Sequence, residues 1–177
     1  MALGQRQTTP SSVALASLWI GISACIPTLS IFGRNLQYRS MEMLSPSALS
    51  LLLGGLVVVA VIGALWWVRV RSLALPYWHL LWFLPIFLIA PFFVPHVVER
   101  LHFLLFGLFG GMTALLFRPW VTLALCLTAS IGDEILQHFL ADRVGDVRDV
   151  YLNAGVSLAA AAFVLLVIRS AGRESQN

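Results

Sequence analysis

Residues 49 to 68 read LSLLLGGLVVVAVIGALWWV, a run that contains no charged side chain. An α-helix rises about 1.5 Å per residue, so a run of this length can cross the ~30 Å hydrocarbon core of a bilayer. Lipid offers no hydrogen-bond partner to the backbone, and a segment that crosses it as a single run must therefore be helical. The run predicts a transmembrane helix.

Similar apolar runs recur along the chain, separated by arginine, proline or acidic residues. Together they predict an all-α, polytopic transmembrane helix bundle of about six spans. The expected spans are residues 13–32, 49–68, 77–94, 101–117, 120–139 and 150–168. Pro85 and Pro91 interrupt the third span, so we expect it to be kinked. Residues 34–47 are expected to form a polar loop between the first two spans.

The composition agrees with a membrane protein. Of 177 residues, 59% are hydrophobic and 11% are charged, which is more apolar surface than a soluble domain of this size could bury. The net charge of +3 comes from arginines, since the chain has no lysine. These arginines are scattered singly and form no basic stripe, so we expect no nucleic-acid partner.

The distribution of arginines predicts the orientation of the chain. An even number of spans places both termini on one side of the membrane, and the cytoplasmic side carries the excess of arginine. The side of the termini would hold Arg6, Arg69, Arg71, Arg118, Arg169 and Arg173; the opposite side would hold Arg34, Arg39, Arg100, Arg143 and Arg148. This small excess favours cytoplasmic termini in a bacterial plasma membrane.

Cys25 follows Ile22-Ser23-Ala24, a sequence that resembles a lipoprotein cleavage box. The apolar run continues through Ile31, past any cleavage point, as it does in a spanning helix. We therefore expect an ordinary first helix, with lipidation at Cys25 as the alternative.

Small residues recur within the spans, including Gly54, Gly55, Gly63 and the pair Gly107-x-x-x-Gly111. Such residues allow two helices to approach closely in a membrane. We expect them to pack helices within one chain, with a homodimer face as the alternative.

Five of the eight acidic residues lie in one segment, residues 132 to 153, which read GDEILQHFLADRVGDVRDVYLN. Charged groups at membrane depth are costly and are rarely placed there without a partner or a task. The function of this protein should therefore be sought in this segment.

Helical spacing groups these polar residues by face. Glu134 and Gln137 share a face at the end of the fifth span, and Glu99 and His102 share one at the start of the fourth. These segments flank the connections between spans three and four and between spans five and six, so they lie at one membrane surface. We expect a single polar pocket there, formed by His102, Glu134, Gln137, Arg143, Asp146, Asp149 and Asn153.

Two motifs in this region resemble a known family. Glu134-x-x-Gln137-x-Phe139, followed by Arg143, Asp146, Asp149 and Asn153, resembles the signature of the VanZ-like family of small bacterial membrane proteins. His102-Phe103-x-x-Phe106-Gly107 resembles the earlier motif of that family. The resemblance covers roughly residues 91–168. It divides the chain into two N-terminal helices outside the match (1–75), a VanZ-like four-helix region (76–170) and a polar tail (171–177).

The sequence departs from the family pattern at a few positions. Val98-Glu99-Arg100 replaces an acid–lysine pair, Ala141-Asp142 replaces proline–glycine, and Val156 stands where a glycine is expected. The family is named for a protein that lowers susceptibility to teicoplanin, a lipophilic glycopeptide. The resemblance therefore implies a role at the cell envelope and no particular reaction.

The polar cluster allows two main interpretations. It can be structural, with Arg143 and Arg148 neutralising the neighbouring acids. Alternatively, it can bind a membrane lipid or a lipid-linked envelope precursor. Arg143 would then hold a phosphate through its planar guanidinium, and Gln137 and Asn153 would hydrogen-bond sugar or peptide, with His102 and Asp146 completing the ligand-binding set.

Catalysis and proton-coupled transport are further alternatives. Glu134, desolvated beside other carboxylates, could act as a general acid or base with Asp149 as its partner. Proton transport would need a broken helix pair or an inverted repeat, and neither is legible in the sequence. Glu99 and His102 have the Glu-x-x-His spacing of carboxylate-bridged metal helices, but a single such pair is a weak signal. We expect no metal site and no other cofactor.

Overall fold

The computed structural model describes residues 10–141 and 145–174, and these residues form helices without any strand. The predicted all-α class is confirmed. The helices, in order, are α1 (Pro10–Met43), α2 (Pro46–Val70), α3 (Tyr77–Leu84), a π-helix (Pro85–Ile89), a 3-10 helix (Ala90–Phe92), a second 3-10 helix (Val97–Glu99), α4 (Arg100–Leu116), α5 (Pro119–His138) and α6 (Val147–Glu174).

Within the described residues, five helices are long and apolar enough to cross a membrane, so the chain is a multi-pass membrane protein. They are α1, α2, α4 with the 3-10 turn before it, α5 and α6. The third expected span is the exception, because its apolar helical segment, Tyr77–Phe92, is shorter. Pro85 opens the π-helix and Pro91 lies in the 3-10 helix after it, as expected for residues that cannot donate a backbone N–H.

The first helix is longer than the sequence predicted. We expected a polar loop at residues 34–47, but α1 continues to Met43, and only two residues separate it from α2. That prediction was wrong because polarity was taken as a loop signal. Arg34, Arg39 and Glu42 are good helix formers, and long side chains at a membrane surface can reach water from a helix.

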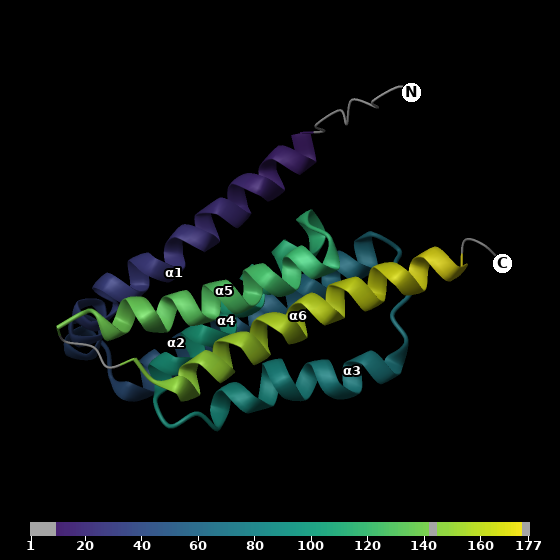
Figure 1. The fold of residues 1–177 in the computed structure, drawn as a ribbon. Helices are drawn as coiled ribbons and strands as arrows, with labels where there is room; N and C mark the ends of the chain where they lie inside the picture. Colours follow the sequence, from purple (N-terminus) through teal and green to yellow (C-terminus); the bar gives the residue numbers. More distant parts are fainter. Residues whose placement is uncertain (1–9, 142–144, 175–177) are drawn as a thin grey trace.

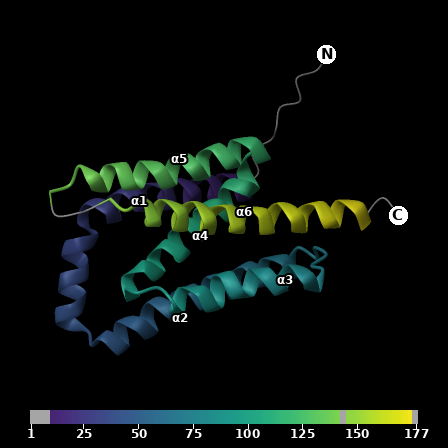
Figure 2. The ribbon, with the colours of Figure 1, turned by 60° about the horizontal axis from the view of Figure 1, so that its bottom comes forward.

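The later part of α1 has a structural role of its own. Figure 2 shows it in blue, turned away from the first part of the helix and running across the end of the bundle. Pro27 and Gly33 both lie in the middle of α1, and each weakens a helix locally. The turned segment forms a wall at one end of the molecule.

The helices alternate in direction, which brings distant segments to the same end of the bundle. In Figure 1, α1 begins and α6 ends at one end, while the α1–α2 connection, the end of α5 and the start of α6 lie at the other. The start of α4 also lies at this second end, because the side chains of α4 and α6 meet there at His102 and Asn153. The polar segments singled out from the sequence therefore share one end.

The centre of the bundle is the packing of α4 on α6, where Phe106 and Phe163 are almost fully buried. The two helices come closest at Gly110, where an added Cβ would lie 2.0 Å from the carbonyl oxygen of Ser157. At Gly107 the nearest atom, 3.0 Å away, belongs to the ring of Phe87. The glycines of α4 thus serve packing within the chain, and the tightest contact falls between the two glycines of the expected motif.

Arg100 is buried at the start of α4, although the sequence placed it in a connection at the membrane surface. Its Nε donates to the carbonyl of Pro91 at 2.9 Å, and its Nη1 donates to the carbonyl and hydroxyl of Ser50 at 2.8 and 2.6 Å. The guanidinium also lies over the ring of Phe92, 4.6 Å from its centre. Arg100 therefore ties α2 to the connection that precedes α4.

Candidate functional site

The histidine of α4 and the asparagine of α6 link the two predicted motifs. His102 Nδ1 and Asn153 Oδ1 are 2.6 Å apart and form a short hydrogen bond. Asn153 is completely buried, whereas His102 is partly exposed. These two residues, both singled out from the sequence, thus meet in the fold.

A salt bridge joins the same two regions. Arg148, in the first turn of α6, donates to the carboxylate of Glu99 at 2.6 Å. The Glu99 side chain is 10% exposed and that of Arg148 is 52% exposed, so the acid is inside and the arginine reaches the surface. Sequence reasoning paired Arg148 with acids of its own segment, whereas the partner is in the 3-10 turn before α4.

Glu134 closes the connection between α5 and α6. One carboxylate oxygen accepts the backbone N–H of Asp146 at 3.0 Å, and the other accepts the amide nitrogen of Gln137 at 3.4 Å. Gly145 is needed here, because an added Cβ would lie 2.7 Å from the Glu134 carbonyl oxygen. The carboxylates of Asp146 and Asp149 are near enough to act electrostatically on Glu134. Glu134 is therefore held by the chain itself.

Asp133 is a site residue that sequence reasoning did not select. It is buried, it is hydrogen-bonded to the hydroxyl of Ser30 on α1, and it accepts the amide nitrogen of Gln137 at 3.2 Å. The spacing of four residues between Asp133 and Gln137 was a signal for a shared face. The partner on α1 could not be found from the sequence, because Ser30 lies in an apolar run 103 residues away.

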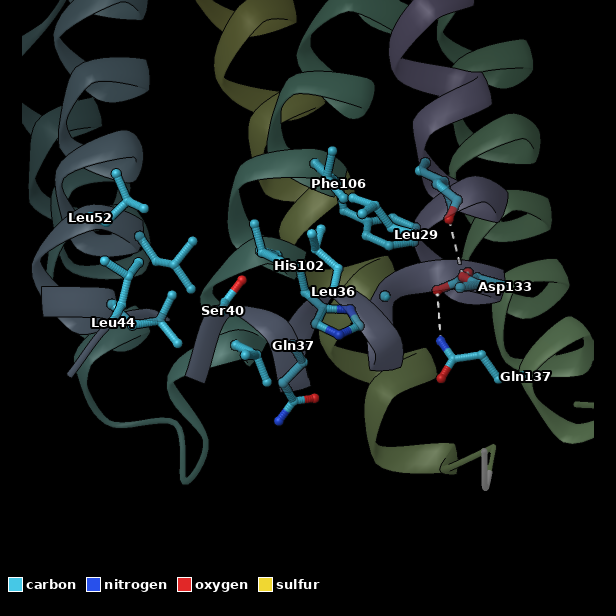
Figure 3. A pocket seen from close by; sticks show the side chains of 18 residues that line it. Leu29, Leu36, Gln37, Ser40, Leu44, Leu52, His102, Phe106, Asp133 and Gln137 are labelled. Atoms are coloured by element: carbon cyan, nitrogen blue, oxygen red, sulfur yellow. Dashed lines mark hydrogen bonds between the residues drawn. The ribbon is translucent and has the colours of Figure 1, made fainter. Parts of the chain in front are cut away.

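A pocket of about 400 Å³ opens beside these residues, between α1, α2, α4 and α5. Its two ends differ in chemistry. Figure 3 shows Leu44 and Leu52 at one end, Asp133 and Gln137 at the other, and His102 between them. Most of the lining is leucine and other apolar side chains, and its polar members are Ser30, Gln37, Ser40, His102, Asp133 and Gln137.

The predicted site residues divide into those that line this pocket and those that do not. His102 and Gln137 line it, and Asn153 lies behind His102. Glu134, Asp146 and Asp149 are outside the lining: Glu134 is in the last part of α5, Asp146 immediately precedes α6, and Asp149 is in the first turn of α6. Arg143, the expected phosphate ligand, is outside the described residues. Three pocket residues on α1 were missed. Ser30 lies in an apolar run, and Gln37 and Ser40 lie in the part of the helix that was expected to be a loop.

The model of one protein family matches residues 26–168, which is most of the chain, and the family is described as VanZ/LLP1. The chain belongs to the VanZ-like family. No curated protein and no solved structure matches it.

The family match begins at Ile26, further toward the N-terminus than the motifs alone indicated. It therefore takes in the later half of α1 and all of α2, the two helices that complete the pocket. In this VanZ-like protein, His102 of the earlier motif and Gln137 of the later one face the same cavity.

The described residues hold no group of three or more histidine, cysteine, aspartate or glutamate side chains arranged to bind a metal ion. Within the Glu-x-x-His pair, Glu99 is bonded to Arg148 and His102 to Asn153. Both residues of the pair therefore contact side chains of α6.

Proposed function

We propose that this VanZ-like protein binds an amphiphilic or lipid-linked molecule of the cell envelope in the pocket between α1, α2, α4 and α5. Binding would lower the susceptibility of the cell to lipophilic glycopeptides. The observation that carries the proposal is the uneven lining of the pocket, with Leu44 and Leu52 at one end, Asp133 and Gln137 at the other, and His102 between them.

The dimensions of the pocket support a small amphiphile. Ligand sites have volumes of about 300–1,000 Å³ and are mostly apolar with a few convergent polar groups. The pocket of about 400 Å³ lies at the low end of this range, enough for a headgroup and part of one chain. Leu49, Leu52 and Leu53 of α2 would contact hydrocarbon. A ligand could enter from the bilayer without exposing its chain to water.

The positions of Glu134 and Asp149 favour binding over acid–base catalysis by this pair. Both oxygens of Glu134 accept hydrogen bonds from the chain itself, and neither Glu134 nor Asp149 lines the pocket. A general acid or base must reach the group whose proton it transfers. We therefore assign Glu134 a positioning role at the α5–α6 connection, with catalysis as the alternative that its variants test.

We propose that the end of the bundle that holds the pocket lies at the outer surface of a bacterial plasma membrane, with both termini in the cytoplasm. The arginine excess on the side of the termini supports this orientation. An outward pocket would meet envelope precursors and glycopeptides where both are found.

The test fills the pocket without altering the bundle. Gln37→Trp places a large ring in the lining from half-buried Gln37 on α1, while Asn35→Trp makes the same change two residues away, at an exposed position outside the lining. Susceptibility to teicoplanin is measured in cells that express each variant at equal abundance. Gln37→Trp should abolish protection and Asn35→Trp should preserve it. Equal protection by both variants would show that the pocket has no part in the activity.

Arg143→Ala tests whether Arg143, which is outside the described residues, contributes a contact to a phosphate of the ligand. If the ligand carries a phosphate held by this side chain, the variant should fold and yet fail to protect cells. Unchanged protection at wild-type abundance would show that Arg143 does not contribute to ligand binding.

A further inference from the structure

The His102–Asn153 pair determines which hydrogen-bonding group the pocket receives. The acceptor in this pair is the Oδ1 of Asn153, which carries no hydrogen. Nδ1 of His102 must therefore be the donor. A neutral imidazole has a single N–H, so its Nε2 is left with a lone pair.

Nε2 is free to act on a ligand. His102 lines the pocket and its ring points into it in Figure 3. Among the described residues, the only hydrogen bond of the ring is the one from Nδ1 to Asn153. The pocket is thus presented with a hydrogen-bond acceptor at its centre.

Asn153 bears a cost that a purely structural residue would avoid. It is fully buried, and within the described part of the chain its Nδ2 has no hydrogen-bond partner. Leaving a buried donor unpaired costs about 1–3 kcal/mol. An apolar side chain of similar size would fill the space between α4 and α6 without that cost. The bond to His102 is the contact that accounts for an asparagine here.

Asp133 and Gln137, at the end of the pocket away from Leu44 and Leu52, also offer acceptors. The amide nitrogen of Gln137 is occupied by Asp133 and Glu134, which leaves its Oε1 to accept. Asp133 contributes carboxylate oxygens to the lining, and a carboxylate can accept several bonds at once. None of the described lining residues is an arginine. A ligand that matches His102, Asp133 and Gln137 must supply donors, while Gln37 and Ser40 of the same lining can each donate as well as accept.

We propose that the pocket recognises a hydroxyl-bearing headgroup, such as a sugar or polyol on a lipid, with His102 Nε2 accepting from a ligand hydroxyl. Asn153 is the positioning residue, because it holds the ring in the tautomer that exposes Nε2 as an acceptor. This inference rests on the proposed function and names the chemistry of the ligand for the same pocket.

The tautomer is tested by ¹⁵N NMR of the purified protein labelled at histidine, with the His102 signals assigned by their loss in His102→Phe. The wild type should show the Nδ1–H tautomer. Asn153→Asp, which keeps an acceptor opposite Nδ1, should retain a protonated Nδ1, and Asn153→Leu should not. An Nε2–H tautomer in the wild type would overturn the assignment of His102 as an acceptor.

Ligand chemistry is tested by native mass spectrometry of the full chain with two lipids of identical acyl chains. One is a monoglucosyl diacylglycerol, which has hydroxyl donors, and the other is phosphatidylcholine, which has none. The wild type should prefer the glucosyl lipid. His102→Phe should weaken glucosyl-lipid binding about two- to tenfold, the value of one neutral hydrogen bond, and leave phosphatidylcholine binding unchanged. His96→Phe is the matched control, because His96 is exposed and outside the lining.

The outcomes separate this inference from the proposed function. If both lipids bind equally, if Gln37→Trp displaces both, and if His102→Phe changes neither, the pocket binds amphiphiles but does not select hydroxyls. The inference is then wrong and the proposed function stands. If Gln37→Trp alters the binding of neither lipid, the pocket is not a lipid site, and both fail.

Discussion

The contact of Gly110 with α6 allows a sharp test of the packing that positions the site. Gly110→Ala would place a Cβ 2.0 Å from the carbonyl oxygen of Ser157. Real Cβ contacts begin at about 3.0 Å, so the two backbones must separate by about 1 Å. The atom encountered belongs to the backbone of a helix and cannot rotate away, unlike the end of a side chain.

The magnitude follows from two opposing terms. Overpacking a core costs about 1–3 kcal/mol, and a rigid backbone contact belongs at the upper end of that range. Replacing glycine by alanine inside a helix returns about 1 kcal/mol. The net loss is about 2 kcal/mol, and for a chain of this size each kcal/mol shifts Tm by about 2–4 °C. We expect Tm to fall by about 4–8 °C.

The assay is thermal unfolding of the purified protein in one detergent, with two glycine controls. Gly155 has no atom within 4 Å of its added Cβ, and the nearest atom to that of Gly111 is Val164 Cγ2 at 3.8 Å, an ordinary contact. Both alanine variants should match or exceed the stability of the wild type. Gly110→Ala should also lengthen the hydrogen bond between His102 and Asn153, which joins the same two helices. If Gly110→Ala proves as stable as Gly155→Ala, the close approach of α4 and α6 is not present in the folded protein.

Three further predictions concern the end of the bundle where α5 ends and α6 begins. Arg148→Ala should lower the free energy of unfolding by about 1–2 kcal/mol, because it leaves the buried carboxylate of Glu99 without its half-exposed partner. Adding Glu99→Gln should recover part of that loss in the same unfolding assay, and no recovery would mean that the pair is not coupled. Glu134→Gln should cost about 1 kcal/mol through one lost hydrogen bond, with protection of cells following protein abundance. Loss of protection at normal abundance, with lipid binding intact, would instead indicate proton transfer. A cysteine introduced within residues 142–148, after Cys25→Ser because Cys25 is exposed whereas Cys126 is buried, should react with an impermeant reagent on intact cells; labelling only after permeabilisation would reverse the orientation.

Much of this molecule could be anticipated from the order of its residues. Apolar run lengths predicted the spanning helices, because a bilayer of given thickness demands a given number of helical residues. Alternation of direction then predicted that the segments carrying His102, Gln137 and Asn153 share one end, and their placement agrees with that expectation. The prolines of the third span also marked where regular helix ends.

Only the tertiary structure decided how these helices surround a pocket. Periodicity tells which residues share a face of one helix, but it does not tell which neighbour that face meets. Ser30 reaches Asp133 across 103 residues, and Arg148 reaches Glu99 rather than an acid of its own segment. The later half of α1 forms a pocket wall because it turns across the end of the bundle, as Figure 2 shows. Pro27 and Gly33 mark where the helix is weakened, but they do not specify which helices the turned segment meets.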